Sequence, residues 1–371
     1  MRRRLKIAFL RLARAMGLFS LARRLTSRRV RILCYHGIWR GSDRYPGDAL
    51  FMTAQRFRRH LELIEAGRYP VVSLDDAVEG IAGMRPLPPS SVAITIDDGW
   101  YSSFVSIWPE LQKRGMPATL YVDTETLLSG KPVPHVMARY LLEEFNQDLE
   151  GYRGALDRAT PKPGGGTLVE RMEAANEVVE ALGLTLSELH ASRRFEYMTA
   201  DELRAAANQG LDVQLHTRGH LLVDLTPEEV ETEVLLNRSD LAEVLGRPHG
   251  EFRHFCYPSG VHHPDMYEGI RRAGVESATT ITLGLADRSS NPLALPRLVI
   301  GEMHSDIEFE AELCGVMDLL RSLRRRRTHS GEGSTRADPP ALGPGREKAA
   351  ARRWTSPPWA SVPSKGRLRG R

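Results

Sequence analysis

The sequence predicts an α/β protein in which parallel strands form a sheet or barrel covered by helices. Short β-rich apolar runs alternate with segments of helical spacing from residue 30 to about 320. The run VAITI, residues 92–96, lies between prolines and a glycine and is apolar throughout, as expected of a buried parallel strand. With 371 residues, 41% of them hydrophobic, the chain can bury the core of one large or two ordinary domains.

Composition restricts the classes of partner and site. Charged residues make up 26% of the chain and the formal net charge is +4, so the composition does not indicate a nucleic-acid partner. Cys34, Cys256 and Cys314 are widely spaced and include no C-x-x-C pair. We therefore expect three buried thiols, with neither a disulfide framework nor a cysteine-based zinc site.

The N-terminal segment 1–29 is basic and amphipathic. Residues 1–42 contain no acid. Arginines interrupt the apolar stretch and no small-residue cleavage site follows, which predicts neither a signal peptide nor a membrane span. Leu5, Phe9, Leu12 and Met16 share one side at helical spacing. Two alternatives stay open: a helix on an anionic membrane surface, or a basic helix packed on its own domain. The expected location is cytoplasmic or peripheral at the inner membrane face.

In the first half of the predicted domain, 30–320, strands and helices are expected to alternate regularly. Strands are expected within 30–38, 69–73, 92–96 and 116–122, and helices within 53–67, from about Ser73, and within 106–115. In the first helix, Phe57, Leu61 and Ile64 share one face and Gly67 ends the segment.

The second half begins with an interruption. Residues 131–195 show helical patterns and no clear strand, which predicts a helical insertion, with a lid as one function. Strands then return within 211–216, 252–258, 277–281 and 295–301, separated by helices within 199–210, 226–246 and 264–274. Thr226 and Glu229 have the spacing of a capping box. From 326 to 371 a basic composition rich in Pro, Gly and Ser predicts a disordered tail.

Two groups of polar side chains follow predicted strands. Asp97 and Asp98 end the strand 92–96, and His216 and His220 follow the strand 211–216. Asp-Asp-Gly is also common turn chemistry, and H-x-x-x-H pairs are often ordinary residues. However, the carboxyl ends of parallel strands face the ligand crevice, so both groups are expected at one site. If the chain turns helical after Leu215, both imidazoles project from one face.

These residue types suit metal-assisted hydrolysis. Two neutral imidazoles and one carboxylate are a three-ligand set for a divalent ion, with zinc the first choice, and leave a position for water. Coordination lowers the pKa of such a water from ~15.7 towards ~7. A neighbouring unligated carboxylate can accept the proton. One aspartate would therefore bind the metal while the other acts as the base.

The motifs resemble those of the polysaccharide deacetylase family, the NodB-homology domain similar to carbohydrate esterase family 4. ITIDDG at 94–99 resembles the family's T-F-D-D-G, and HTRGH at 216–220 resembles H-[ST]-x-x-H. Further matches keep the family's order, in ILCYHGI, KRGMPATLYV, FRHFCYPSG, RRAGVESATT and LPRLVI, so that the resemblance covers about residues 30–315. It implies an irregular (β/α) barrel with a divalent metal and hydrolysis of N-acetyl or O-acetyl groups of polysaccharides.

The resemblance assigns the main roles by position. Asp97 matches the base, Asp98 the metal-binding aspartate, and His216 and His220 the metal histidines. In the third motif, Cys256 and Ser259 stand where relatives have the arginine and tyrosine of R-x-P-Y, and Tyr257 lies between them. The backbone N–H of Ser259 could still stabilise an oxyanion.

The remaining roles have alternatives. Arg297 is the candidate that replaces the missing arginine beside the base, or else it forms an ordinary surface ion pair. His304 matches the general acid in position, or is an exposed loop residue. His36, with Tyr257 and Ser259, is expected beside the substrate, or is a core histidine.

The function expected from these residues is removal of acetyl groups from an exopolysaccharide or a lipid-linked sugar. Its partners would be an acetylated polysaccharide or lipid-linked glycan and an anionic membrane. Two alternatives remain: a catalytically idle carbohydrate-binding domain of the same fold, and a deacylase of a non-sugar amide.

Overall fold

The computed structural model describes residues 2–41, 50–162 and 164–329, the side chains of Arg2 and of residues 325–329 excepted. Residues 1–318 form one compact unit, and residues 319–371 are assigned to a second. The predicted tail from residue 326 overlaps α15 (Val316–His329) and then passes outside the described residues.

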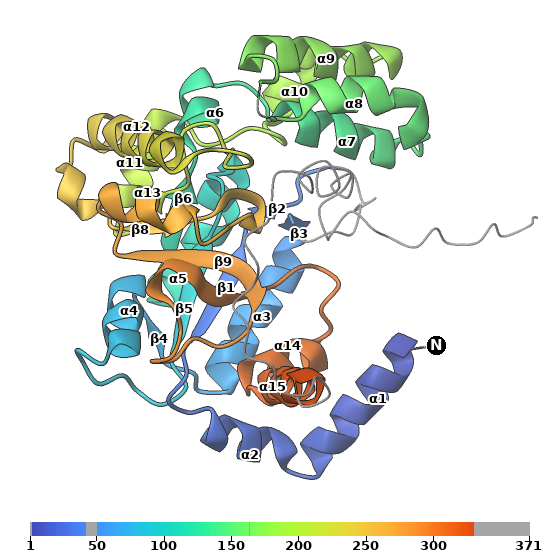
Figure 1. Ribbon diagram of the computed structural model, residues 1–371. Coiled ribbons are helices and arrows are strands. Elements are labelled where there is room, and N and C mark those ends of the chain that lie inside the picture. Colours follow the sequence, from blue (N-terminus) through green and yellow to red (C-terminus); the bar gives the residue numbers. More distant parts are fainter. Residues whose placement is uncertain (1, 42–49, 163, 330–371) are drawn as a thin grey trace, which may run out of the picture. The chain divides into compact units, whose positions relative to one another are not determined.

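A closed barrel of parallel strands forms the centre of the first unit (Figure 1). Around the barrel, neighbouring strands are β1, β10, β9, β8, β7, β6 and β5, and a pairing between β1 and β5 closes it. Their bounds are β1 (Arg31–Tyr35), β5 (Val92–Ile96), β6 (Thr119–Val122), β7 (Asp212–Leu215), β8 (His254–Cys256), β9 (Ser277–Leu283) and β10 (Leu295–Val299). β4 (Val71–Val72) pairs with the start of β5. The predicted α/β barrel is confirmed.

The strands are apolar because both of their faces are covered. All residues of β1, β5 and β6 are buried. A separate two-stranded sheet pairs β2 (Gly37–Ile38) with β3 (Phe51–Met52). Arg31 and Arg297 are charged exceptions within the core strands, and each is satisfied by hydrogen bonds.

Helices connect the strands and cover the barrel. Between β3 and β6 lie α3 (Ala54–Ala66), α4 (Leu74–Ala82) and α5 (Trp108–Lys113), the last entered by a π-helical turn at Ser103–Ile107. After β7 follow α12 (Pro227–Leu245), α13 (Met266–Arg272) and α14 (Asp306–Leu313). Thr226 and Glu229 form the predicted capping box of α12. None of the described helices has both the length and the apolar character needed to cross a membrane.

The segment between β6 and β7 is helical. It contains α6 (Thr124–Ser129), α7 (Pro134–Glu144), α8 (Arg153–Ala159), α9 (Leu168–Ala181), α10 (Leu186–Ser192) and α11 (Ala200–Asn208). Helices α7 to α10 form a separate group in Figure 1 and fall within the predicted insertion, 131–195. The described residues of that insertion contain no strand, in agreement with the prediction.

At the N-terminus, the predicted amphipathic segment forms two helices rather than one. They are α1 (Arg2–Ala15) and α2 (Leu18–Leu25). Gly17 separates them with a left-handed backbone, φ 75°, a conformation that glycine adopts without steric cost. The three cysteines are free and buried, as expected.

Candidate active site

Asp97 and Asp98 lie at the carboxyl end of β5, and both are buried. The Asp97 N–H donates to the carbonyl of Tyr35, which extends the pairing with β1 by one residue. Asp98 then takes a left-handed conformation, φ 79°, and Gly99 follows at φ 107°. Such a backbone is costly for aspartate and is typical of functional sites. The turn directs the two neighbouring carboxylates to different partners.

Asp98 faces both histidines of the second motif. Its Oδ1 lies 3.3 Å from Nε2 of His216 and 3.4 Å from Nε2 of His220. The predicted helical turn between the histidines is wrong: residues 218–220 form a bend after β7. Left-handed conformations at Thr217, φ 66°, and His220, φ 54°, turn the chain back. The loop, and not helical periodicity, brings the imidazoles together.

Hydrogen bonds fix the orientation of the His216 ring. The backbone N–H of His216 donates to Oδ1 of Asn237. Its Nδ1 lies 2.8 Å from the carbonyl oxygen of Cys256. Because a carbonyl can only accept, Nδ1 carries a proton, and Nε2 is the ring nitrogen directed at Asp98.

The donor set fits a divalent cation. Ligand atoms of Asp98, His216 and His220 all lie within 4.8 Å of one another. The separations of 3.3 and 3.4 Å match the edge of a tetrahedron with metal–ligand bonds of about 2.0–2.1 Å. At 3.3 Å, Nε2 of His216 either donates a proton to Asp98, since this contact holds the pKa of His216 well above its usual value, or offers a lone pair to a cation held between the two groups. These three residues are therefore a possible ligand group for a divalent ion.

Asp97 is held by Arg297 instead. Nη1 and Nη2 of Arg297 donate to Oδ1 and Oδ2 of Asp97, each over 2.7 Å, and both side chains are buried. Burial alone would raise the pKa of Asp97, but the charge and hydrogen bonds of Arg297 hold it at about 2. Arg297 is thus a buried partner of the candidate base and not part of a surface ion pair.

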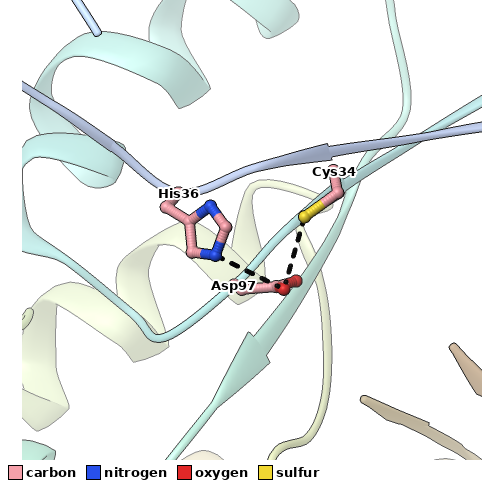
Figure 2. A group of neighbouring side chains, drawn as sticks. All are labelled: Cys34, His36 and Asp97. Carbon is pink, nitrogen blue, oxygen red and sulfur yellow. Dashed lines mark hydrogen bonds and ion pairs between the residues drawn. The ribbon is translucent and has the colours of Figure 1, made fainter. Parts of the chain in front are cut away.

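His36 also lies beside Asp97. Its Nε2 is 3.7 Å from Asp97 Oδ2, too far for a direct hydrogen bond (Figure 2). The buried Nδ1 of His36 has no hydrogen-bond partner among the described residues. Figure 2 also shows the Cys34 thiol beside the same carboxylate, with Sγ 3.5 Å from Oδ2.

Three other predicted site residues have different surroundings. Ser259 is exposed and left-handed, φ 54°, and its N–H makes no hydrogen bond among the described residues. The Tyr257 hydroxyl donates to the carbonyl of Leu293. Nδ1 of His304 contacts the backbone of Gly301, and the described hydrogen bonds and ion pairs do not link His304 to either aspartate. The roles predicted for these three residues stay predictions, because the described hydrogen bonds and ion pairs do not connect their side chains to the two aspartates or to His216 and His220.

Several residues that support the site were not predicted from the sequence. Nε1 of Trp100 donates to Oδ2 of Asp98 over 2.7 Å, which leaves Oδ1 for the histidines. Asn237 lies on the buried face of α12 with Val234 and Leu241, and a lone amide on such a face could have signalled its role. The Cys256 thiol lies 3.4 Å from Asp97 Oδ2 and accepts from Arg297.

The family of the chain follows from its match to one family model. A model described as polysaccharide deacetylase matches residues 84–278, more than half of the 371 residues. The chain belongs to the polysaccharide deacetylase family. As a member of this family it is a hydrolase of the class that acts on non-peptide carbon–nitrogen bonds.

Among curated proteins, this deacetylase is similar to the poly-β-1,6-N-acetyl-D-glucosamine N-deacetylase of Escherichia coli strain K12. The two are 24% identical over 287 residues, which cover 76% of this chain and 38% of that protein. The chain thus matches well under half of the E. coli enzyme's length.

Two solved structures share the fold of this polysaccharide deacetylase. The Streptococcus pyogenes deacetylase PplD, in complex with acetate, gives a TM-score of 0.53 at 16% identity and covers 77% of this chain and 98% of its own. IcaB from Ammonifex degensii gives 0.52 at 19% identity and covers 77% and 97%. At these identities the likeness concerns the fold.

Proposed function

We propose that the chain removes N-acetyl groups from N-acetylhexosamine residues of an exopolysaccharide or a lipid-linked glycan. The observation that carries this proposal is the division of labour between two adjacent carboxylates. Asp98 faces two imidazole nitrogens at 3.3 and 3.4 Å, whereas both oxygens of Asp97 accept hydrogen bonds from Arg297. One carboxylate is thereby a ligand and its neighbour a base, the pair of roles that metal-assisted hydrolysis needs.

Asp98, His216 and His220 would hold the metal, with zinc the best match to the donor set. When bound, a divalent ion polarises the acetyl carbonyl and lowers the pKa of a water molecule. Asp97 accepts the proton of the attacking water as its oxygen bonds to the acetyl carbon. Arg297 keeps Asp97 ionised and fixes its orientation as a positioning residue.

The amide carbon–nitrogen bond then breaks, and the leaving amine needs a proton. His36 is better placed than His304 to supply it, because Nε2 of His36 lies beside the base. Residues Ser259 and Tyr257 border the same end of β8. The Ser259 N–H is the proposed oxyanion donor.

The name of the E. coli relative supports an N-acetylglucosamine polymer as the substrate class. That protein is an N-deacetylase of poly-β-1,6-N-acetyl-D-glucosamine, and 76% of this chain aligns with it. An N-acetyl group is therefore the first substrate to test, with O-acetyl esters as the comparison.

Acetate release tests the proposal directly. The purified chain is incubated with β-1,6- and β-1,4-linked N-acetylglucosamine oligomers and with an O-acetylated oligosaccharide, with and without a chelator. We expect acetate from an N-acetylated oligomer, loss of release with chelator, and recovery on adding zinc. Asp97→Asn should lower release by at least roughly a thousandfold. Oligomer binding without acetate release from any substrate, metal restored, would instead support the idle carbohydrate-binding alternative, which Cys256 and Ser259 motivate.

A further inference from the structure

Helices α1 and α2 present a row of apolar side chains to solvent. Leu5, Phe9, Leu12 and Met16 are 52–66% exposed, and their spacing places them along one side of α1 and of the turn that follows it. The row continues on α2, where the exposed residues are Leu18, Leu21 and Leu25. Scattered exposed leucines need no explanation, but seven large apolar residues on two consecutive helices form a patch.

The opposite side of the two helices already has a partner within the chain. Leu10, Ala13 and Phe19 are buried in one cluster with Ile307 and Ala311 of α14. Ion pairs support this packing: Lys6 contacts Glu308, and Arg14 contacts Glu310. Burial on the protein therefore uses one face of the amphipathic segment and leaves the Leu5–Met16 face outward.

Unpaired positive charge flanks this outward face. Arg4, Arg11, Arg24 and Arg28 are exposed, and the described residues give them no ion-pair or hydrogen-bond partner. Neither helix contains an acidic residue. A hollow beside α1 is lined by Arg11 and by two paired arginines, Arg14 and Arg56, together with Asp306 of α14, the partner of Arg56. Apolar side chains on two helices that carry no acid, beside the unpaired Arg4, Arg11 and Arg24, complement an anionic lipid surface.

We infer that the α1–α2 face binds the surface of an anionic lipid membrane, with the apolar row entering the headgroup region and the arginines contacting lipid phosphates. A segment with this distribution lies in the interface plane and does not cross the bilayer. A second copy of the chain is the poorer occupant, because a symmetric contact would bring the same unpaired arginines together. The inference does not depend on the proposed deacetylase activity.

Vesicle sedimentation of the full chain tests the inference. Vesicles of phosphatidylcholine alone are compared with vesicles containing phosphatidylglycerol, at low and high salt. We expect binding to the phosphatidylglycerol vesicles that weakens with salt. Arg4→Gln with Arg11→Gln should weaken partitioning about five-fold per arginine removed. Phe9→Gln with Leu12→Gln should weaken it by at least roughly tenfold, because both side chains lose insertion energy.

Matched control variants carry the same changes elsewhere. Met84→Gln with Val169→Gln replaces two equally exposed apolar residues, and Arg271→Gln with Arg288→Gln removes two exposed charges. Both controls should bind vesicles like the wild type, and acetate release from soluble oligomers should be equal in all variants. Absence of vesicle binding, or controls that lose binding as strongly as the α1 variants, would overturn the inference. So would a dimer in sedimentation velocity that Phe9→Gln with Leu12→Gln dissociates while vesicles bind neither form.

Discussion

Arg297 of β10 donates two parallel hydrogen bonds of 2.7 Å to Asp97 at the end of β5, and both side chains are buried. The two residues are 200 positions apart in sequence. In the resemblance to related deacetylases, the arginine beside the base belongs to the third motif, where this chain has Cys256. Here the guanidinium comes from a different strand and also contacts the Cys256 thiol.

Removing one member of this pair should be costly. Arg297→Met leaves the buried Asp97 charge uncompensated, and we expect the free energy of unfolding to fall by about 3–5 kcal/mol. Adding Asp97→Asn removes that charge and should restore part of the loss. Urea denaturation of the two single variants and the double variant measures the coupling. Strictly additive losses would show that the pair is not an energetic unit.

Trp100 should affect metal affinity through Asp98. Its indole N–H holds Oδ2, so Trp100→Phe frees the carboxylate to rotate, and we expect metal affinity to fall about 10–100-fold. Trp108→Phe is the matched control, because Trp108 is also buried and its Nε1 has no hydrogen-bond partner among the described residues. Competition for zinc with a chromogenic chelator compares the variants. Equal losses in both would indicate a general packing effect.

His36 and His304 should differ in their effect on turnover. If His36 protonates the leaving amine, His36→Gln lowers kcat by about 10²–10⁴-fold with little change in bound metal. His304→Gln should have a much smaller effect, since the described contacts of His304 are with Gly301. Acetate release at saturating oligomer measures both. The reverse ranking would return the acid role to His304.

His60 should make the fold sensitive to acid. It is fully buried, its ring nitrogens have no hydrogen-bond partner in the described structure, and it stacks on Phe309 at 4.2 Å. Burial lowers its pKa from 6.5 to about 3, so the unfolded chain takes up the proton first as the pH falls. The stability that the neutral ring provides is complete above pH 6.5 and is lost as the pH falls towards 3.

The variant His60→Leu should be less acid-sensitive than the wild type. From pH 7 to pH 4.5 the His60 contribution amounts to roughly 2–3 kcal/mol, which the variant should not lose. Urea denaturation at several pH values gives the two curves. Parallel curves would show that His60 is already protonated or solvated in the folded chain.

The sequence predicted the barrel and the main cluster because both depend on local patterns. Apolar runs ending in Asp97 and His216 identify strand ends, and a parallel barrel brings such ends together. Contacts between distant strands leave no such local pattern. Cys34 and Cys256 stand in apolar runs of the sequence, as inert buried thiols do, yet both thiols lie beside Asp97.

The conformation of the loop from His216 to His220 could not be predicted from the sequence pattern either. The i, i+4 spacing of His216 and His220 suggested a helix, but left-handed residues in a bend bring the rings together. Two histidines four residues apart are compatible with a helix and with a tight loop. Only the φ values in the structure distinguish the two.

The assignment of Asp98 as ligand and Asp97 as base can be checked by metal content after dialysis, measured per chain for the wild type, Asp97→Asn and Asp98→Ala. We expect one divalent ion per chain in the wild type and in Asp97→Asn, and little or none in Asp98→Ala. An Asp98→Ala variant that retains the full ion, or an Asp97→Asn variant that loses it, would contradict the division of roles between the two aspartates.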